Sequence, residues 1–154
     1  MSEKQVAIGC DEAGFALKNI LTEHLKTMGV DVIDYGCHST DPVDYPDVAE
    51  RLAKDIAAKK TDRGILVCGT GIGMCIAANK VPGVYAAQAH DTFSAERARK
   101  SNNAQVITLG ARVIGPELAK QIITSWMNSE FAGGNSARKV EKIHKIEQGA
   151  GETA

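Results

Sequence analysis

The sequence predicts an α/β fold: a Rossmann-like three-layer sandwich in which helices cover both faces of a five-stranded parallel sheet. Short apolar runs alternate with segments of helical periodicity along the chain, which is typical of repeated strand–helix units. The runs at 65–67 and 106–109 are largely apolar without alternation, as strands are when both of their faces are covered. Strands buried on both faces and joined through helices pair in parallel, so these observations favour a sheet between two helical layers.

The expected elements follow one another in a regular order. Five strands are expected, near 5–10, 30–35, 63–68, 83–88 and 104–109. Between them, helical spacing covers 14–28, 45–59, 71–80 and 92–101. Gly115 and Pro116 predict the start of a fifth helix that continues through Trp126, because proline is favoured in the first turn of a helix. This pattern leaves the order of the strands within the sheet open.

The last part of the chain departs from the alternation. Residues 131–136, which include Gly133 and Gly134, interrupt the pattern before a last helix expected over 137–147, and residues 148–154 are expected to fray. We expect this helix to pack on a partner subunit; a helix folded back on its own domain is the alternative. The chain is therefore predicted to form one domain over 1–154, with 131–147 as a C-terminal extension.

Composition narrows the functional classes. The chain has 154 residues and a formal net charge of −1, and a domain of this size buries about 70% of the surface of its unfolded chain. The balanced charge argues against nucleic acid or a lipid surface as a partner. No segment is apolar enough to span a bilayer and the first residues lack a signal-peptide pattern, so we expect a cytoplasmic protein.

The four cysteines do not form a recognisable metal or disulfide pattern. They are Cys10, Cys37, Cys68 and Cys75, with no Cys-x-x-Cys pair among them. In a chain without an export signal this spacing predicts free thiols rather than disulfides or zinc ligands. We expect Cys10, Cys37 and Cys75 to serve as packing residues.

The segment after the third expected strand carries the strongest functional signal. Cys68 ends an apolar run and is followed by Thr70 and by glycines at alternate positions, Gly69, Gly71 and Gly73. Glycines can turn backbone N–H groups toward an oxyanion, and the N-terminus of the following helix favours negative charge at the same place. The spacing matches neither the phosphate-binding loop of nucleotide hydrolases nor Gly-x-Gly-x-x-Gly. We therefore predict a site for a phosphorylated or enolising substrate, with Cys68 as a nucleophile or base; a tight turn with a buried structural cysteine is the alternative.

Polar residues also follow the other strands. Asp11 and Glu12 follow the first strand, His90 the fourth and Arg112 the fifth. Because the carboxyl ends of parallel strands meet at one edge of the sheet, we expect these side chains to surround the glycine loop. Arg112 at this edge favours binding of a phosphate or carboxylate. Asp11 is equally suited to cap the helix expected near Gly14, and His90 to hold a loop by hydrogen bonding.

Five motifs occur in a fixed order along the chain. They are Gly9-Cys10-Asp11-Glu12-Ala13-Gly14-Phe15, Asp44-Tyr45-Pro46, Cys68-Gly69-Thr70-Gly71-Ile72-Gly73, Ser101-Asn102-Asn103-Ala104 and Gly110-Ala111-Arg112-Val113-Ile114-Gly115. Together they resemble the ribose-5-phosphate isomerase B and galactose-6-phosphate isomerase (RpiB/LacAB) family. The match runs from residue 5 to about residue 147, which is nearly the whole chain.

The resemblance implies an aldose–ketose isomerase that uses neither metal nor cofactor and works through a cis-enediolate. Cys68 would be the base that moves the proton between C1 and C2, and Thr70 would assist at the substrate oxygens. Backbone N–H groups of the 69–73 loop would hold the enediolate oxyanion. Asp11 and Asn102 would bind hydroxyl groups, and Arg112 would bind the phosphate end.

The same resemblance implies partners and a further contact residue. The ligand would be a small phosphorylated sugar, and Tyr45 would lie among the residues that bind it. The protein would be a homodimer or tetramer with its sites at subunit interfaces.

The chain departs from the family pattern in the residues expected to contact the phosphate and the sugar ring. Glu12 stands where the family usually has a histidine that touches the phosphate, and Ser101 where it has the histidine that opens the sugar ring. Two phosphate-binding arginines of the pentose enzymes correspond here to Asn135 and Lys139, with Arg138 beside Lys139. We therefore expect a rearranged phosphate site. Glu12, Ser101, Arg138 and Lys139 are candidate substrate-binding residues.

Loss of the ring-opening histidine has a chemical explanation. An aldopentose 5-phosphate closes a furanose ring through O4 and must be opened by proton transfer before C2 can lose its proton. A tetrose 4-phosphate cannot close this ring, because O4 carries the phosphate. Segments 90–97 and 108–112, with Cys68 and Cys75, also resemble the branch of the family that acts on tetrulose phosphates. We therefore expect D-erythrulose 4-phosphate and D-erythrose 4-phosphate as the substrate pair.

Two other functions stay open. One is isomerisation of ribose 5-phosphate or a hexose 6-phosphate, with His90 or water opening the ring. The other is a non-catalytic subunit that binds a sugar phosphate. Retention of Cys68, Thr70 and Asp11 argues against the non-catalytic function.

Overall fold

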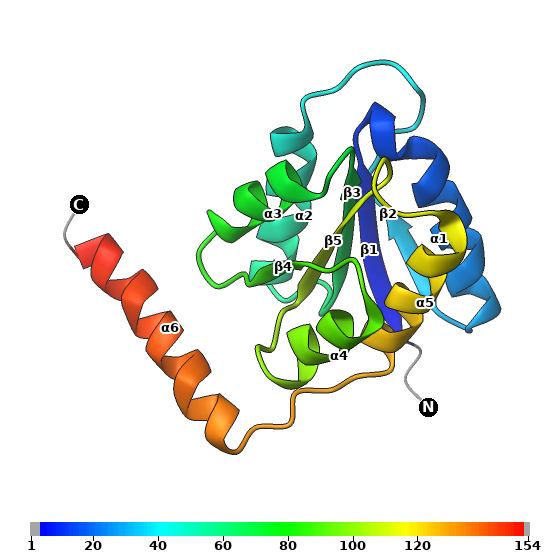
Figure 1. Ribbon diagram of the computed structural model, residues 1–154. Helices are drawn as coiled ribbons and strands as arrows, with labels where there is room; N and C mark the ends of the chain where they lie inside the picture. Colours follow the sequence, from blue (N-terminus) through cyan, green and yellow to red (C-terminus); the bar gives the residue numbers. More distant parts are fainter. Residues whose placement is uncertain (1–3, 153–154) are drawn as a thin grey trace.

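The chain folds into three layers, a parallel sheet between two layers of helices (Figure 1). The computed structural model describes residues 4–152. All five predicted strands are present: β1 (Gln5–Cys10), β2 (Asp31–Asp34), β3 (Gly64–Cys68), β4 (Ala86–Gln88) and β5 (Val106–Gly110). Their order across the sheet is β2-β1-β3-β5-β4, and every adjacent pair is parallel. The predicted fold class is confirmed.

Helices occupy the segments between the strands and follow the last strand. They are α1 (Phe15–Thr27), α2 (Tyr45–Ala57), α3 (Ile72–Asn79), α4 (Thr92–Lys100), α5 (Pro116–Met127) and α6 (Asn135–Glu152), with a 3-10 turn, η1 (Glu12–Gly14), before α1. Local signals start several of them: Asp91 caps α4 by accepting a hydrogen bond from the Ser94 N–H (2.6 Å), and Pro46 and Pro116 lie in the first turns of α2 and α5. None of the helices within residues 4–152 is long and apolar enough to cross a membrane.

Each face of the sheet has its own hydrophobic core. The core under α1, α4 and α5 includes Leu21, Ile122 and Trp126, and the core under α2 and α3 includes Leu52 and Met74. All five of these side chains are fully buried. Every residue of β3 and β5 is buried as well, because both faces of these central strands are covered, and this explains why their sequences do not alternate.

Most of the predicted ranges are within two residues of the observed ones at each end, and two elements differ by more. β4 covers Ala86–Gln88 rather than 83–88, because Val84 closes a turn onto the Val81 carbonyl and the Tyr85 N–H donates to the side chain of Gln105. α6 covers Asn135–Glu152, so it is longer at both ends than the predicted 137–147. Residues 148–152, which were expected to fray, are helical, and residues 153–154 lie outside the described part of the chain.

The strand order predicts a ligand-binding crevice at one edge of the sheet. The chain leaves β1 toward β2 and then returns to β3 on the other side of β1. In open parallel sheets, such a reversal leaves a gap beyond the carboxyl ends of the two strands, where ligands bind. The ends of β1 and β3 lead directly into Asp11 and the glycine loop, so the fold places these predicted residues beside the crevice.

Candidate active site

Cys68 is the last residue of β3 and is almost completely buried. The backbone N–H of Gly71 donates a hydrogen bond to its sulfur at 3.1 Å. The helix α3 begins one residue later, at Ile72. An N–H donor and a helix N-terminus both favour anionic groups nearby, so the sulfur lies at the end of the loop where an anionic ligand is favoured.

The loop after Cys68 requires glycine for its shape. Gly71 has a φ of +78°, and a Cβ there would lie 2.9 Å from the backbone of Leu109. Gly110, which faces the loop from β5, approaches the backbone of Thr70 so closely that a Cβ would lie 2.7 Å from it. A side chain at either position would push the loop away from β5.

Two polar side chains hold this loop in place, and neither was predicted from the sequence. The Thr108 hydroxyl, fully buried in β5, donates to the Gly71 carbonyl at 2.8 Å. The Gln88 amide, at the end of β4, donates to the Thr70 carbonyl at 2.7 Å. The available signal was a single polar residue in each otherwise apolar strand. Buried or strand-end polar groups need partners, and here the partner is the glycine loop.

Three N–H groups of the loop have no hydrogen-bond partner within residues 4–152: those of Gly69, Thr70 and Gly73. The Thr70 hydroxyl accepts a hydrogen bond from the Ile72 N–H at 3.2 Å and remains exposed. Unpaired donors on one short loop next to Cys68 can bind an anionic oxygen. This agrees with the oxyanion site expected from the sequence.

Arg112 and Asp11 lie beside the same loop. The Arg112 guanidinium lies over Gly69, where a Cβ would be 3.3 Å from its Nη1, and the Arg112 N–H donates to the Gly69 carbonyl at 3.0 Å. Asp11 caps the turn η1 by accepting from the Gly14 N–H at 3.2 Å, which confirms the capping expectation. Burial raises the pKa of the Asp11 carboxyl, and the Gly14 hydrogen bond and the charge of Arg112 oppose that rise. Asp11 and Arg112 are thus close enough to interact across the crevice.

Glu12 and Tyr45 border the loop from the β1 and α2 sides. The Glu12 carboxylate accepts a hydrogen bond from the Val43 N–H at 3.3 Å, so it holds the segment that leads into α2. The Tyr45 ring, at the start of α2, packs directly on Gly73, where an added Cβ would overlap it. Tyr45 is partly exposed beside the glycine loop.

His90 also reaches the carboxyl edge of the sheet. Its Nε2 accepts a hydrogen bond from the Gly110 N–H at 2.9 Å, and Gly110 pairs with Cys68 in the sheet. An acceptor Nε2 places the proton of the neutral ring on Nδ1. His90 therefore holds the end of β5, as the loop-holding alternative expected.

Ser101 and Asn102 lie at the opposite edge of the sheet. They follow α4 and precede β5, whose first residue is Val106, whereas Cys68 pairs with its last residue, Gly110. Four residue steps of about 3.3 Å each separate the two ends of that strand. The Ser101 hydroxyl accepts a hydrogen bond from Arg97 Nε at 2.8 Å. Within one chain these two residues do not meet Cys68.

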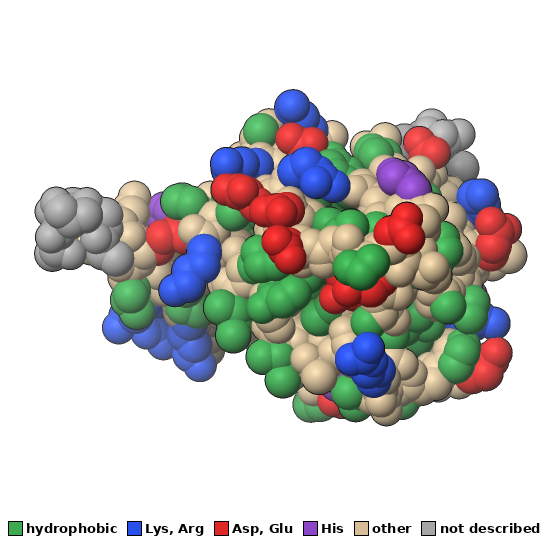
Figure 2. All heavy atoms as spheres, turned by 90° about the horizontal axis from the view of Figure 1, so that it is seen from above, with side chains coloured by type: hydrophobic (Ala, Val, Ile, Leu, Met, Phe, Trp, Pro, Cys, Tyr) green, Lys and Arg blue, Asp and Glu red, His purple; other side chains and the backbone are tan. Residues whose placement is uncertain are grey.

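Arg138 and Lys139 are also away from the glycine loop. Both are exposed on α6, which extends from the rest of the chain as an arm (Figure 1). Seen from above, basic side chains gather on this arm (Figure 2). Within residues 4–152, α6 is hydrogen-bonded to the sheet-containing part through Glu147, whose carboxylate oxygens accept from the Gly83 N–H, the shorter contact at 3.1 Å. The structure thus brings Cys68, Thr70 and Arg112 together and leaves the predicted phosphate-binding candidates Arg138 and Lys139 elsewhere.

Comparison with known proteins identifies close relatives over almost the whole chain. The Ribose/Galactose Isomerase family profile (LacAB_rpiB) matches residues 6–143. The chain is 63% identical over 140 residues to D-erythrulose-4-phosphate isomerase of Pectobacterium atrosepticum, which covers 90% of this chain and 91% of that protein. It is 49% identical over 144 residues to ribose-5-P isomerase B of Listeria innocua, covering 94% and 97% of the two chains.

A solved structure shows the same arrangement of strands and helices. Ribose-5-phosphate isomerase B of Mycoplasma genitalium, with bound ribulose-5-phosphate, aligns with a TM-score of 0.91 at 37% identity, covering 96% of this chain and 99% of that one. Sequence and structure agree over the whole sheet and its helices. The chain therefore belongs to the ribose/galactose isomerase (RpiB/LacAB) family and is a sugar-phosphate isomerase.

Proposed function

We propose that this chain interconverts D-erythrulose 4-phosphate and D-erythrose 4-phosphate by moving a proton between C1 and C2 through a cis-enediolate, without metal or cofactor. The observation that carries the proposal is the Cys68 sulfur, bonded by the Gly71 N–H beside three unpaired N–H groups. The 63% identity to the Pectobacterium enzyme supports the choice of substrate.

In this mechanism Cys68 is the base. As a thiolate it takes the proton from the carbon next to the carbonyl and returns it to the neighbouring carbon. Negative charge develops on the substrate oxygen as the enediolate forms. The N–H groups of Gly69, Thr70 and Gly73 are fixed before the reaction, so they stabilise that charge without reorganisation. The exposed Thr70 hydroxyl assists proton movement between the two oxygens.

The residues around the base orient the substrate. Asp11 and Asn102 bind its hydroxyl groups, and Tyr45 borders the crevice next to Gly73. Arg112, whose guanidinium lies over Gly69, binds the phosphate end. Glu12 is committed to the Val43 N–H, which supports a phosphate site rearranged relative to the family pattern.

Ser101 supports an acyclic substrate. It stands at the family's ring-opening position, and its hydroxyl is held by Arg97 Nε. His90 uses Nε2 to accept from Gly110, so that nitrogen is not available as a ring-opening base. A tetrose 4-phosphate has no furanose form to open, so neither group is needed for it.

The proposal includes a homodimer or tetramer whose sites lie between subunits. Ser101, Asn102, Arg138 and Lys139 cannot reach Cys68 within one chain, and a second copy would supply them. The arm α6 carries Ile143 and Ile146 with 45% and 73% of their surfaces exposed. Exposed apolar side chains on an otherwise charged helix favour contact with another subunit. The chain would act as one cytoplasmic domain over 1–154, with 131–147 as the extension that makes this contact.

The first test compares two sugars. A coupled assay of the full chain should give a kcat/KM for erythrose 4-phosphate at least about 10-fold above that for ribose 5-phosphate. Equal or better turnover of ribose 5-phosphate would reject the tetrose assignment in favour of a pentose enzyme. Turnover of neither sugar, nor of a hexose 6-phosphate, would favour the non-catalytic subunit.

A second test addresses the absence of a cofactor. Protein treated with EDTA and then dialysed should isomerise its substrate at the untreated rate. A loss of activity that added divalent cation restores would contradict metal-free proton transfer by Cys68.

A further inference from the structure

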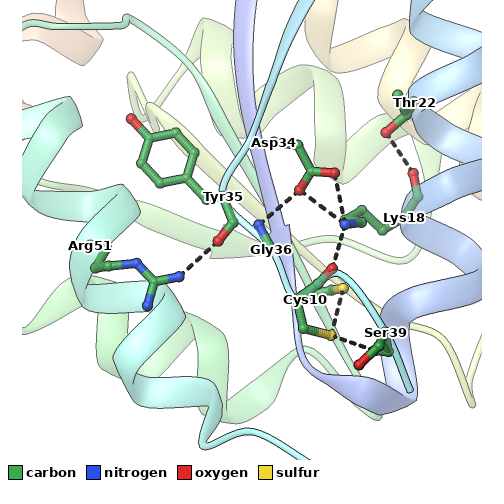
Figure 3. Close-up of polar contacts among 9 residues, drawn as sticks. Cys10, Lys18, Thr22, Asp34, Tyr35, Gly36, Ser39 and Arg51 are labelled. Atoms are coloured by element: carbon green, nitrogen blue, oxygen red, sulfur yellow. Dashed lines mark hydrogen bonds and ion pairs between the residues drawn. The ribbon is translucent and has the colours of Figure 1, made fainter. Parts of the chain in front are cut away.

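Two cysteines that the proposed reaction does not use lie in contact behind the site. Cys10 ends β1 and Cys37 follows β2, and their sulfurs are 3.7 Å apart. Both are free thiols and both are buried. In Figure 3 a dashed line marks the contact of the Cys10 sulfur with the second sulfur.

The backbone holds these two residues side by side. The Cys37 N–H donates to the Cys10 carbonyl at 2.8 Å, and the Cys10 N–H donates to the Gly36 carbonyl at 2.7 Å. Lys18, fully buried, donates to the Cys37 carbonyl at 2.6 Å and to both Asp34 oxygens at 2.9 Å (Figure 3). Adjacent strands lie about 4.8 Å apart, within the Cα separation of about 4.4–6.8 Å that a disulfide spans. The main chain therefore needs little movement for the sulfurs to bond.

We propose that Cys10 and Cys37 form a redox modification site, at which a peroxide converts the two thiols into an intramolecular disulfide.

Cys37 is the thiol that the oxidant reaches first. It lines a surface cavity of about 470 Å³ together with Tyr35, Ser39 and Asp47, whereas Cys10 is 0% exposed. The Cys37 thiol donates to the Ser39 carbonyl at 3.2 Å, which leaves its sulfur to accept the S–H of Cys10. Burial, together with the neighbouring Cys37 side chain, raises the pKa of the Cys10 thiol to about 12, so Cys10 stays protonated during the first step.

The chemistry balances in two steps. The Cys37 sulfur attacks one oxygen of hydrogen peroxide, the O–O bond breaks, and the products are a sulfenic acid on Cys37 and one water. The Cys10 sulfur then attacks the Cys37 sulfur, the S–O bond breaks, and hydroxide leaves with the Cys10 proton as a second water. Two thiols lose two electrons and two protons in total, and the peroxide is reduced to two waters.

The disulfide would act on the candidate site through Asp11. The sulfurs must approach from 3.7 Å to about 2.05 Å, and Cys10 is followed directly by Asp11, whose N–H donates to the Val67 carbonyl beside Cys68. Displacement of a substrate-binding group by about 1 Å costs on the order of 100-fold in rate. This consequence, unlike the disulfide itself, rests on the proposed function, and we expect oxidation to lower turnover by at least about 10-fold, reversibly.

The test measures the bond before it measures the rate. The full chain is treated with hydrogen peroxide, its remaining thiols are alkylated under denaturing conditions, and the peptides are identified by mass spectrometry. We expect a Cys10–Cys37 crosslink that dithiothreitol removes. The Cys37→Ser variant should give no crosslink, and Cys75→Ser, which changes a partly buried cysteine outside the pair, should keep it. Sulfinic acid on Cys37 without a crosslink, or a crosslink that joins other cysteines, would overturn the proposal.

The rate measurement must separate this pair from Cys68, which peroxide can also oxidise. Oxidised wild type and Cys75→Ser should lose turnover in step with the crosslink and recover with dithiothreitol. In Cys37→Ser, the remaining turnover should equal the fraction of molecules whose Cys68 has not been oxidised. A complete crosslink with unchanged turnover would reject the effect on Asp11. Because the crosslink is read by mass, the result stands even if the chain proves to act on another sugar.

Discussion

The two groups of predicted site residues differ in where one chain places them. Cys68, Thr70 and Arg112 gather at the carboxyl edge of the sheet, held by hydrogen bonds within the chain. Ser101 and Asn102 lie at the other edge, and Arg138 and Lys139 lie on the exposed arm α6. The first group carries the proposed proton transfer and one proposed phosphate contact, Arg112. The second group carries the proposed recognition of ring form and the other proposed phosphate contacts. If the proposed function and assembly hold, one chain would supply the proton-transfer groups, while part of the substrate selection would depend on a second copy.

The largest effect is expected at the base. Cys68→Ala should lower kcat by at least about 1,000-fold, because a positioned general base contributes on the order of 100- to 10,000-fold. The coupled assay measures this loss, and thermal unfolding should show that the variant is folded. Cys75→Ala, which changes the other thiol on this side of the sheet, should keep nearly full activity. If Cys68→Ala still isomerises the substrate, Cys68 is not the base.

Mixing two inactive variants tests whether the groups meet across subunits. Cys68→Ala and Asn102→Ala each damage a different group, so a mixed dimer would contain one intact site and one with both changes. After random exchange of subunits, the mixture should recover about one quarter of the wild-type activity. The assay compares the mixture with each variant alone after mild unfolding and refolding. A mixture no more active than the better variant would place both groups in one subunit.

Ser101→His tests the substrate selectivity of the second group. A histidine there supplies the missing ring-opening acid or base, so kcat/KM for ribose 5-phosphate should rise by about 10-fold or more relative to erythrose 4-phosphate. Turnover of the tetrose should change little. Ser101→Asn, which adds a polar side chain that does not titrate, serves as the matched control. Equal gains in both variants would assign the effect to packing rather than to ring opening.

The smallest effect concerns stability at the carboxyl edge. Burial raises the folded-state pKa of Asp11 above its ordinary 3.8, so the folded chain binds this proton more readily than the unfolded chain. The free energy of unfolding is therefore lowered as the pH rises from that ordinary value through the folded pKa. Asp11→Asn removes the ionisation, and its stability relative to wild type should be greater at neutral than at acid pH. Urea unfolding of both proteins at about pH 4 and pH 7 measures this difference in the free energy of unfolding. If Asp11→Asn gains stability relative to wild type in acid instead, the pKa of Asp11 is not raised.

Local sequence patterns predicted the strands because burial on both faces leaves a clear apolar signature. They could not give the order β2-β1-β3-β5-β4, since pairing joins segments that are distant in the chain. The start of β4 was predicted three residues too early, because Val84 and Tyr85 are apolar but bond into a turn and to Gln105. A pattern of hydrophobicity does not report which partner an N–H group finds.

The candidate site, like the fold, was predicted in part. Sequence patterns predicted that Asp11, Cys68 and Arg112 lie at one edge of the sheet, because each is at or within two residues of the carboxyl end of a strand. Thr108 and Gln88 were missed because one polar residue in an apolar strand does not reveal its partner. In the proposed assembly, the position of Ser101 and the α6 cations relative to the base would depend on a second copy of the chain, which patterns within one sequence do not place.

The route from α5 to α6 has a further consequence. Gly133 and Gly134 have φ angles of +70° and +60°, which side chains rarely tolerate. Just before them, Arg63 donates to the carbonyls of Trp126 and Ser129, which fixes the chain where it leaves the domain. The direction of the arm is thus set by backbone chirality at a pinned starting point. In the proposed assembly, an arm with one fixed direction would favour reciprocal exchange between two copies, which closes the assembly, over open-ended growth.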